Sequence, residues 1–231
     1  MAAAPALIIT NPWVSKDTKW LAACAATPIR VLAVEEQPLV REGLVAIIDS
    51  QPEMKVIAQA STGREAIDQF RRYRPDIVTL DLLLPDIPGD EVARRILSEF
   101  RDARVVVVTA ARGDVQLHQA LEAGVKGIVL KGMQKAELLD VIRQVRGGRK
   151  VIPRQVASTL AEHLGDEVLT AREIQVLRLV AQGFRNKQVA ANLYIAEETV
   201  RMHMKNILGK LAARDRTHAV TIALARGVFQ L

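Results

Sequence analysis

From Ile29 onward, short β-branched runs alternate with longer amphipathic stretches, and this alternation constrains the fold more than any other feature of the chain. Each run has the length of one buried strand, and each stretch has apolar residues at the three-and-four spacing of a helix. Such alternation is typical of a doubly wound α/β domain with a five-stranded parallel sheet. The predicted strands span Ile29–Val34, Lys55–Ala58, Asp76–Leu80, Arg104–Thr109 and Gly127–Leu130; the predicted helices span Leu39–Asp49, Arg64–Arg72, Asp90–Phe100, Val115–Ala123 and Lys135–Val145.

The chain changes character at both ends of this region. Residues 1–28, with Pro5, Pro12 and Pro28, show no sustained periodicity, and we predict a disordered N-terminal extension. Residues 29–147 form the α/β domain, and residues 148–168 form a linker with a short helix. Residues 169–231 are predicted to be an all-α domain, because every later element has helical spacing. Its predicted helices span Thr170–Gln182, Asn186–Leu193, Glu197–Leu211 and Thr217–Arg226.

Composition excludes several classes of protein. The longest uncharged stretch, residues 1–15, is interrupted by Pro5 and Pro12, so we expect no membrane span. Cys24 is the one cysteine of the chain, which excludes an internal disulfide or a Cys-based zinc site and fits a cytoplasmic protein. Residues 154–231 carry 11 Lys and Arg against 7 Asp and Glu. This excess suggests a polyanionic partner, although a solvated basic surface is the alternative.

Polar side chains follow the predicted strands where a parallel sheet gathers its carboxyl ends. Glu35 and Glu36 follow the first strand, Asp81 the third and Lys131 the fifth, while Thr109 ends the fourth. Three converging carboxylates repel one another unless a cation is present, and oxygen ligands favour Mg²⁺. An aspartyl carboxylate beside an ammonium and a hydroxyl is suited to carry a phosphoryl group. A lone aspartate there would more simply be a solvated loop residue.

These segments resemble the receiver domain of bacterial two-component response regulators, which has a flavodoxin-like fold. The resemblance lies in residues 29–43 (IRVLAVEEQPLVREG), 75–89 (PDIVTLDLLLPDIPG), 105–110 (VVVVTA) and 124–132 (GVKGIVLKG). It implies that a sensor histidine kinase phosphorylates Asp81 and that Thr109 and Lys131 sense the phosphoryl group. It also implies that Mg²⁺ is held by Glu35, Glu36, Asp81 and the Leu83 carbonyl.

The sequence departs from the receiver pattern at two places. The acidic pair usually contains at least one Asp, whereas Glu35 and Glu36 are both one methylene longer. Because Mg²⁺ demands near-octahedral geometry, longer arms are expected to shift or weaken its site. Ile128 occupies a position that is often Tyr or Phe, an aromatic that reports the switch to the output surface.

The C-terminal region has the helix, short turn and helix of a DNA-reading motif. In the predicted helix Glu197–Leu211, apolar residues form one stripe and Glu198, Arg201, Met202 and Lys205 lie on the other side. The region from Leu169 to Leu231 resembles the LuxR-type helix-turn-helix, and residues 169–211 follow its pattern almost residue by residue. The resemblance implies that Lys187 and Thr199 contact phosphates, that Arg201, Met202 and Lys205 face base edges, and that the last helix dimerises. Ala196 replaces the Ser common at the N-cap, which removes about 1 kcal/mol of helix stability.

Together the two resemblances indicate a two-component response regulator of the NarL/FixJ class. The predicted function is a non-enzymatic transcription factor that is switched by phosphorylation of Asp81. Its predicted partners are an inverted-repeat site in double-stranded DNA, a sensor histidine kinase, RNA polymerase and a second copy of the chain. Three alternatives stay open: an atypical receiver that controls DNA binding without phosphorylation, a receiver acting only through protein partners, and an aspartate-dependent phosphatase. The second is disfavoured by the intact DNA-reading helix, and the last because Leu83 stands where such phosphatases have a general acid.

Overall fold

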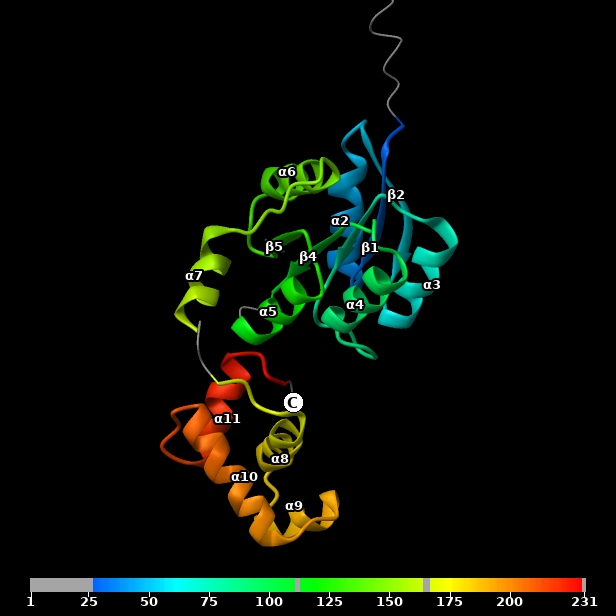
Figure 1. Cartoon of the computed structure of the whole chain (residues 1–231). Coiled ribbons are helices and arrows are strands. Elements are labelled where there is room, and N and C mark those ends of the chain that lie inside the picture. Colours follow the sequence, from blue (N-terminus) through cyan, green and yellow to red (C-terminus); the bar gives the residue numbers. More distant parts are fainter. Residues whose placement is uncertain (1–26, 111–112, 164–166, 230–231) are drawn as a thin grey trace, which may run out of the picture.

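A parallel sheet forms the centre of the N-terminal domain. The computed structural model describes residues 27–110, 113–163 and 167–229 (Figure 1). The described strands are β1 (Ile29–Val34), β2 (Met54–Ala60), β3 (Ile77–Leu80), β4 (Val105–Thr109) and β5 (Gly127–Leu130). They pair in parallel in the order β2-β1-β3-β4-β5, so the predicted doubly wound sheet is confirmed.

Helices cover both faces of this sheet (Figure 1). One face packs on α2 (Pro38–Asp49) and α6 (Lys135–Arg146), through side chains such as Ile48 and Ile142. The other packs on α3 (Gly63–Tyr73), α4 (Gly89–Glu99) and α5 (Asp114–Glu122), through side chains such as Ala66, Val92 and Leu117. Because both faces are buried, the strands are almost wholly apolar rather than alternating.

The first half of the predicted linker is packed against the N-terminal domain. Val151 forms an isolated parallel bridge with Gly127, the first residue of β5. The helix α7 (Arg154–Glu162) follows, and its Val156 is buried in the same apolar cluster as Ile128. The predicted linker helix is therefore present, and it covers the side of the domain near α5 and β5. The predicted disorder of residues 1–28 falls almost entirely outside the described residues.

The described part of the C-terminal region is helical. Its helices are α8 (Ala171–Ala181), α9 (Asn186–Leu193), α10 (Glu197–Lys210) and α11 (Arg216–Ala225). They enclose an apolar core that includes Val176, Leu177, Val200 and Ile207. The helix α11 begins one residue earlier than predicted, because the Asp215 side chain accepts a hydrogen bond from the His218 N–H and caps the helix. Within the described ranges, no helix is long and apolar enough to cross a membrane.

Candidate phosphoacceptor site and DNA interface

The register of the parallel strands brings the predicted polar residues to one edge of the sheet. Val34 pairs with Leu80, so Glu35 and Asp81 follow from adjacent strands at the same level. Thr109 pairs with Leu130, which places Lys131 beside the end of β4. Glu35, Asp81 and Thr109 are all buried at this edge.

Lys131 connects the two buried carboxylates. Its Nζ lies 2.6 Å from Asp81 Oδ2 and 2.7 Å from Glu35 Oε2. Burial alone would lower the pKa of Lys131, but its hydrogen bonds with Asp81 and Glu35 outweigh this effect and raise that pKa. The ammonium therefore stays charged, and one positive charge faces two negative ones.

Backbone groups hold the remaining carboxylate oxygens. Asp81 Oδ1 accepts a hydrogen bond from the Leu83 N–H at 3.2 Å, and Glu35 Oε1 accepts one from the Gln37 N–H at 3.1 Å. The Arg41 guanidinium donates to the Glu35 carbonyl at 2.7 Å, which anchors the turn after β1 to α2. The two side chains are thus oriented by the loops that follow their own strands.

The acidic pair is divided between the interior and the surface. Glu35 is fully buried, whereas Glu36 is exposed. Among the described residues, no three His, Cys, Asp or Glu side chains are arranged to hold a metal ion. The buried Glu35 Oε2 is held by its ion pair with Lys131 Nζ, at 2.7 Å. The available donors are all oxygens, which fits Mg²⁺ by chemistry, and Glu36 would have to turn inward to complete the set.

Two positioning residues were missed by the sequence analysis. Gly89 begins α4 so close to the acceptor loop that an added Cβ would lie 2.2 Å from the Asp81 carbonyl oxygen. Asp86 accepts hydrogen bonds from the N–H groups of Gly63 and Arg64, at 2.7 and 3.0 Å, and so caps α3 from a distant loop. The Pro88-Gly89 step is the local signal for the first contact, whereas no local pattern indicates the second.

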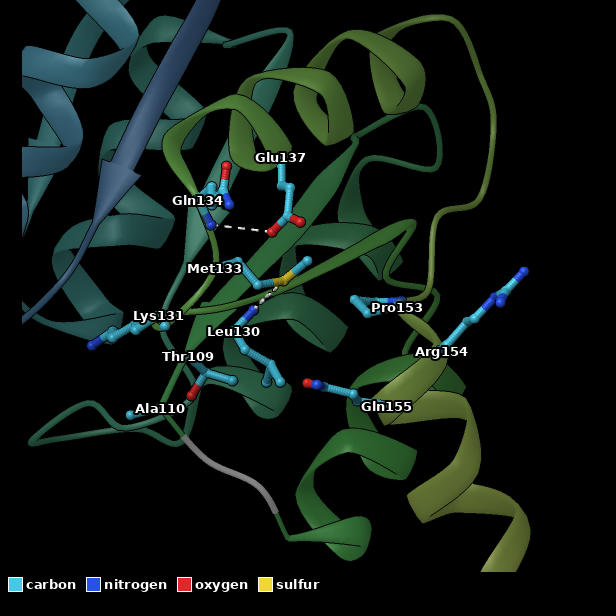
Figure 2. A pocket seen from close by; sticks show the side chains of 11 residues that line it. Thr109, Ala110, Leu130, Lys131, Met133, Gln134, Glu137, Pro153, Arg154 and Gln155 are labelled. Atoms are coloured by element: carbon cyan, nitrogen blue, oxygen red, sulfur yellow. Dashed lines mark hydrogen bonds between the residues drawn. The ribbon is translucent and has the colours of Figure 1, made fainter.

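A cavity of about 680 Å³ lies beside this edge of the sheet. Figure 2 shows Thr109 and Leu130 on one side of it and Gln155, from the start of α7, on the other. In the same view the Gln155 side chain points toward Leu130, whereas Arg154 points away from the cavity. The predicted phosphoryl-sensing Thr109 and the linker-helix residue Gln155 therefore line the same cavity.

The helix α10 has the two-sided character that the sequence predicts. Val200, Met204 and Ile207 are buried against the other helices. The predicted base-reading residues Arg201, Met202 and Lys205 are exposed, as is the predicted phosphate contact Lys187 on α9; Thr199 is half-buried. Ala196 stands at the N-cap without a side-chain hydrogen bond, as its residue type requires.

Arg201 is held by carboxylates of its own helix. Its Nη2 lies 2.9 Å from Glu197 Oε1, and its Nη1 lies 3.2 Å from Glu198 Oε2. Hydrogen bonding to Glu197 and the charges of both glutamates raise the pKa of Arg201. To read a guanine edge, this guanidinium must exchange at least one of these partners for the base.

The two domains meet where α11 ends and α5 begins. Arg226 forms an ion pair with Asp114, with 2.7 Å between Nη2 and Oδ2, and both side chains are largely buried. The Val115 N–H, at the uncapped start of α5, donates to the Arg226 carbonyl at 3.2 Å. Gly113 is also required here, because a Cβ would lie 2.4 Å from the Arg226 carbonyl group. No local pattern in the sequence predicts this contact, which joins residues 112 positions apart.

Comparison with known proteins identifies both domains. Residues 31–143 match the family described as response regulator receiver domain, and residues 167–223 match bacterial regulatory proteins of the luxR family. The transcriptional regulatory protein LiaR of Bacillus subtilis (strain 168) is 34% identical over 203 residues, which are 84% of this chain and 96% of LiaR. This chain belongs to the two-component response regulators of the luxR family. It is a DNA-binding transcription regulator, as the sequence predicts.

Two further relatives and one fold neighbour are similar to this response regulator. The response regulator protein VraR of Staphylococcus aureus (strain NCTC 8325 / PS 47) is 31% identical over 207 residues, covering 87% of this chain and 99% of VraR. Response regulator ChrA, from a heme-sensing two-component system, has 32% sequence identity to this chain. Its crystal structure matches with a TM-score of 0.54 over 87% of this chain and 99% of ChrA. RcsB from Salmonella enterica serovar Typhimurium shares the fold at 21% identity and a TM-score of 0.63, covering 85% of this chain and 98% of RcsB.

Proposed function

We propose that this response regulator is switched by transfer of a phosphoryl group from a sensor histidine kinase to Asp81. The observation that carries the proposal is the convergence of Asp81 with Lys131 and Thr109 at the carboxyl end of the sheet. Asp81 is 1% exposed and lies 2.6 Å from the Lys131 ammonium. A carboxylate fixed beside a cation is positioned for nucleophilic attack, and the product gains charge where a cation already stands.

Phosphoryl transfer to Asp81 replaces a P–N bond with a P–O bond. An Asp81 carboxylate oxygen attacks the phosphorus of a phosphohistidine, the P–O bond forms, and the P–N bond breaks. The imidazole leaves with the electron pair of that bond and takes a proton from solvent. Lys131 then exchanges its contact with Asp81 Oδ2 for a phosphoryl oxygen, and the Thr109 hydroxyl donates to another.

Receiver domains generally bind Mg²⁺ at the phosphorylation site, and the oxygen donors of this chain fit that ion. We propose that Glu35, Glu36, Asp81 and the Leu83 carbonyl would hold it. When bound, the ion supplies positive charge that offsets repulsion between the carboxylates and the incoming phosphoryl group. Glu36 is the exposed member of the set, so it is the side chain that must move most.

For the DNA-binding domain we propose a homodimer on an inverted repeat. Lys187 and Thr199 would contact phosphates, and Arg201, Met202 and Lys205 would read base edges in the major groove. RcsB from Salmonella enterica serovar Typhimurium, a fold neighbour, was solved bound to promoter rprA in the presence of phosphomimetic BeF₃⁻. A regulator of this kind would act in the cytoplasm, where RNA polymerase is its further partner.

Regulation without phosphorylation is a second candidate, favoured by the Lys131 contacts. The ammonium already offsets part of the repulsion between the buried Glu35 and Asp81 without a phosphoryl group. We propose no catalytic turnover in either case. Leu83, two residues after Asp81, offers no acid to protonate a leaving group.

Intact-mass measurement after incubation with acetyl phosphate and Mg²⁺ tests the proposal. The wild type should gain one phosphoryl group, Asp81→Asn should gain none, and Asp102→Asn, at an exposed loop position, should behave as the wild type. An equal adduct on Asp81→Asn would refute the assignment of the acceptor. An unmodified wild type that still binds DNA would instead support the second candidate.

A further inference from the structure

The DNA-facing side of α10 carries a carboxylate as well as basic groups. Glu198, Arg201, Met202 and Lys205 are all exposed and follow the i, i+3, i+4, i+7 spacing of one helical face. Glu198 lies in the first turn of α10, and the N-terminal residues of a recognition helix are those that reach base edges. Its side chain therefore belongs to the surface that would enter the groove.

Glu197 and Glu198 differ in their ion-pair contacts with Arg201. Glu197 makes the shorter contact, 2.9 Å at the favourable i, i+4 spacing, and its side chain is 42% exposed. Glu198 makes the longer contact, 3.2 Å at i, i+3, and its side chain is 82% exposed. Arg201 thus keeps a partner in Glu197 when Glu198 turns outward to another donor.

A carboxylate at a DNA surface is repelled by phosphates, and a hydrogen bond from a base donor offsets that cost. In the major groove the donors are the exocyclic amines of cytosine and adenine, and Glu pairs with cytosine N4. Resting on the proposed DNA-binding function, we propose that Glu198 is a specificity-determining residue that selects a cytosine beside the guanine read by Arg201. A base that presents only hydrogen-bond acceptors at that position offers no donor to the Glu198 carboxylate.

A competing explanation is that Glu198 only stabilises α10. Acidic side chains are favourable in the first turn of a helix, and α10 lacks a capping side chain at Ala196. That role would affect the thermal midpoint of the protein and leave the choice of base unchanged. Glu197 shares the same turn and the same arginine, so it provides a matched control.

The test is selection of bound sequences from a random DNA pool by the full chain, with and without acetyl phosphate. The wild type should prefer cytosine by about tenfold at one position of each half-site, and Glu198→Ala should reduce this to about twofold or less. Glu198→Gln should move the preference to adenine, because a carboxamide pairs with adenine N6 and N7. Glu197→Gln should keep the cytosine. Glu198→Ala should also bind unrelated DNA more tightly, since a negative charge near the phosphates is removed.

Two results would overturn the inference, and they are distinguishable. If the wild type enriches a defined site but Glu198→Ala and Glu198→Gln keep its base preferences, Glu198 does not read a base and the proposed function stands. If the wild type enriches no sequence under either condition, the proposed DNA reading fails and this inference fails with it. Thermal unfolding of each variant establishes that a changed preference does not come from a lost fold.

Discussion

At the scale of single residues, Gly89 shows how closely the acceptor loop is packed. A Cβ at this position would lie 2.2 Å from the Asp81 carbonyl oxygen and 2.6 Å from Leu82 Cα, both of them backbone atoms that cannot move aside cheaply. Gly89→Ala should therefore lower the free energy of unfolding by about 1 to 3 kcal/mol and slow phosphorylation of Asp81. Urea unfolding measures the first effect and mass spectrometry the second.

Gly43 is the matched control for this substitution. It lies within α2, and an added Cβ meets no atom within 4 Å among the described residues. Gly43→Ala should stabilise the protein by about 0.5 to 1 kcal/mol, because alanine loses less backbone freedom in a helix. Equal destabilisation by both substitutions would show that the close contact at Gly89 does not limit the fold.

Lys187 allows a second prediction at this scale, because phosphate and base contacts have different consequences. Lys187 is exposed on α9 and is a positioning charge in the proposed complex. Lys187→Ala should weaken binding to all sequences alike and lower the slope of log K against log salt by about one unit. Arg201→Ala should instead cost about 1 to 3 kcal/mol on the cognate site and relax preference at particular base pairs.

Binding titrations at several salt concentrations, on cognate and unrelated duplexes, separate these two effects. If Arg201→Ala keeps the base preferences of the wild type while Lys187→Ala changes them, α10 is not the helix in the groove.

At the scale of elements, a polar network joins the start of α8 to the end of α10. Glu173 accepts a hydrogen bond from Lys210 Nζ at 2.9 Å, and its carboxylate is paired with the backbone and hydroxyl of Thr170 in a capping box. Burial by itself raises the pKa of Glu173, but the bonds from Lys210 and Thr170 outweigh it and lower that pKa. The Glu173 carboxyl group is thus charged when it accepts these hydrogen bonds.

The lowered pKa of Glu173 determines how the stability of the protein depends on pH. A carboxyl group whose pKa is lowered on folding contributes stability that is complete above its unfolded pKa, about 4.3, and is lost as pH falls through the lower folded value. Glu173→Gln should lower the thermal midpoint at neutral pH, and its difference from the wild type should shrink below about pH 4. Circular dichroism melts across this range check it, with the exposed Glu162→Gln as control. A difference that is constant with pH would contradict the assigned charge.

At the scale of the whole molecule, the ion pair between Asp114 and Arg226 ties the two domains together. Its side chains are 8% and 15% exposed, so a lone charge left there would be poorly solvated. Asp114→Arg should therefore separate the domains, which small-angle X-ray scattering would record as a larger radius of gyration. Combining Asp114→Arg with Arg226→Asp should restore the compact form, because the pair is re-formed with its charges exchanged.

Asp140→Arg, at an exposed position on α6, is the control for the change of charge alone. It should leave the radius of gyration as in the wild type. A double variant as extended as the single one would show that the ion pair does not hold the domains together.

The sequence by itself determined the elements of this protein and the strand ends that carry its chemistry. Periodicity is a local property, so β1 and the capping box of Thr170 could be read directly from neighbouring residues. The parallel order of strands then predicts that Glu35, Asp81, Thr109 and Lys131 share one edge. Family resemblance supplied the roles proposed for them.

Only the tertiary structure decided which of these groups face one another and which do not. In the folded protein Glu35 is buried and Glu36 is exposed. Lys131 contacts the carboxylates of Glu35 and Asp81, and Asp114 pairs with Arg226 across 112 positions. No local pattern contains such information, because adjacent glutamates look alike in sequence and a distant partner has no fixed spacing. Packing of the helices against the sheet and of one domain against the other sets these contacts, since burial requires each charge to find a partner in space.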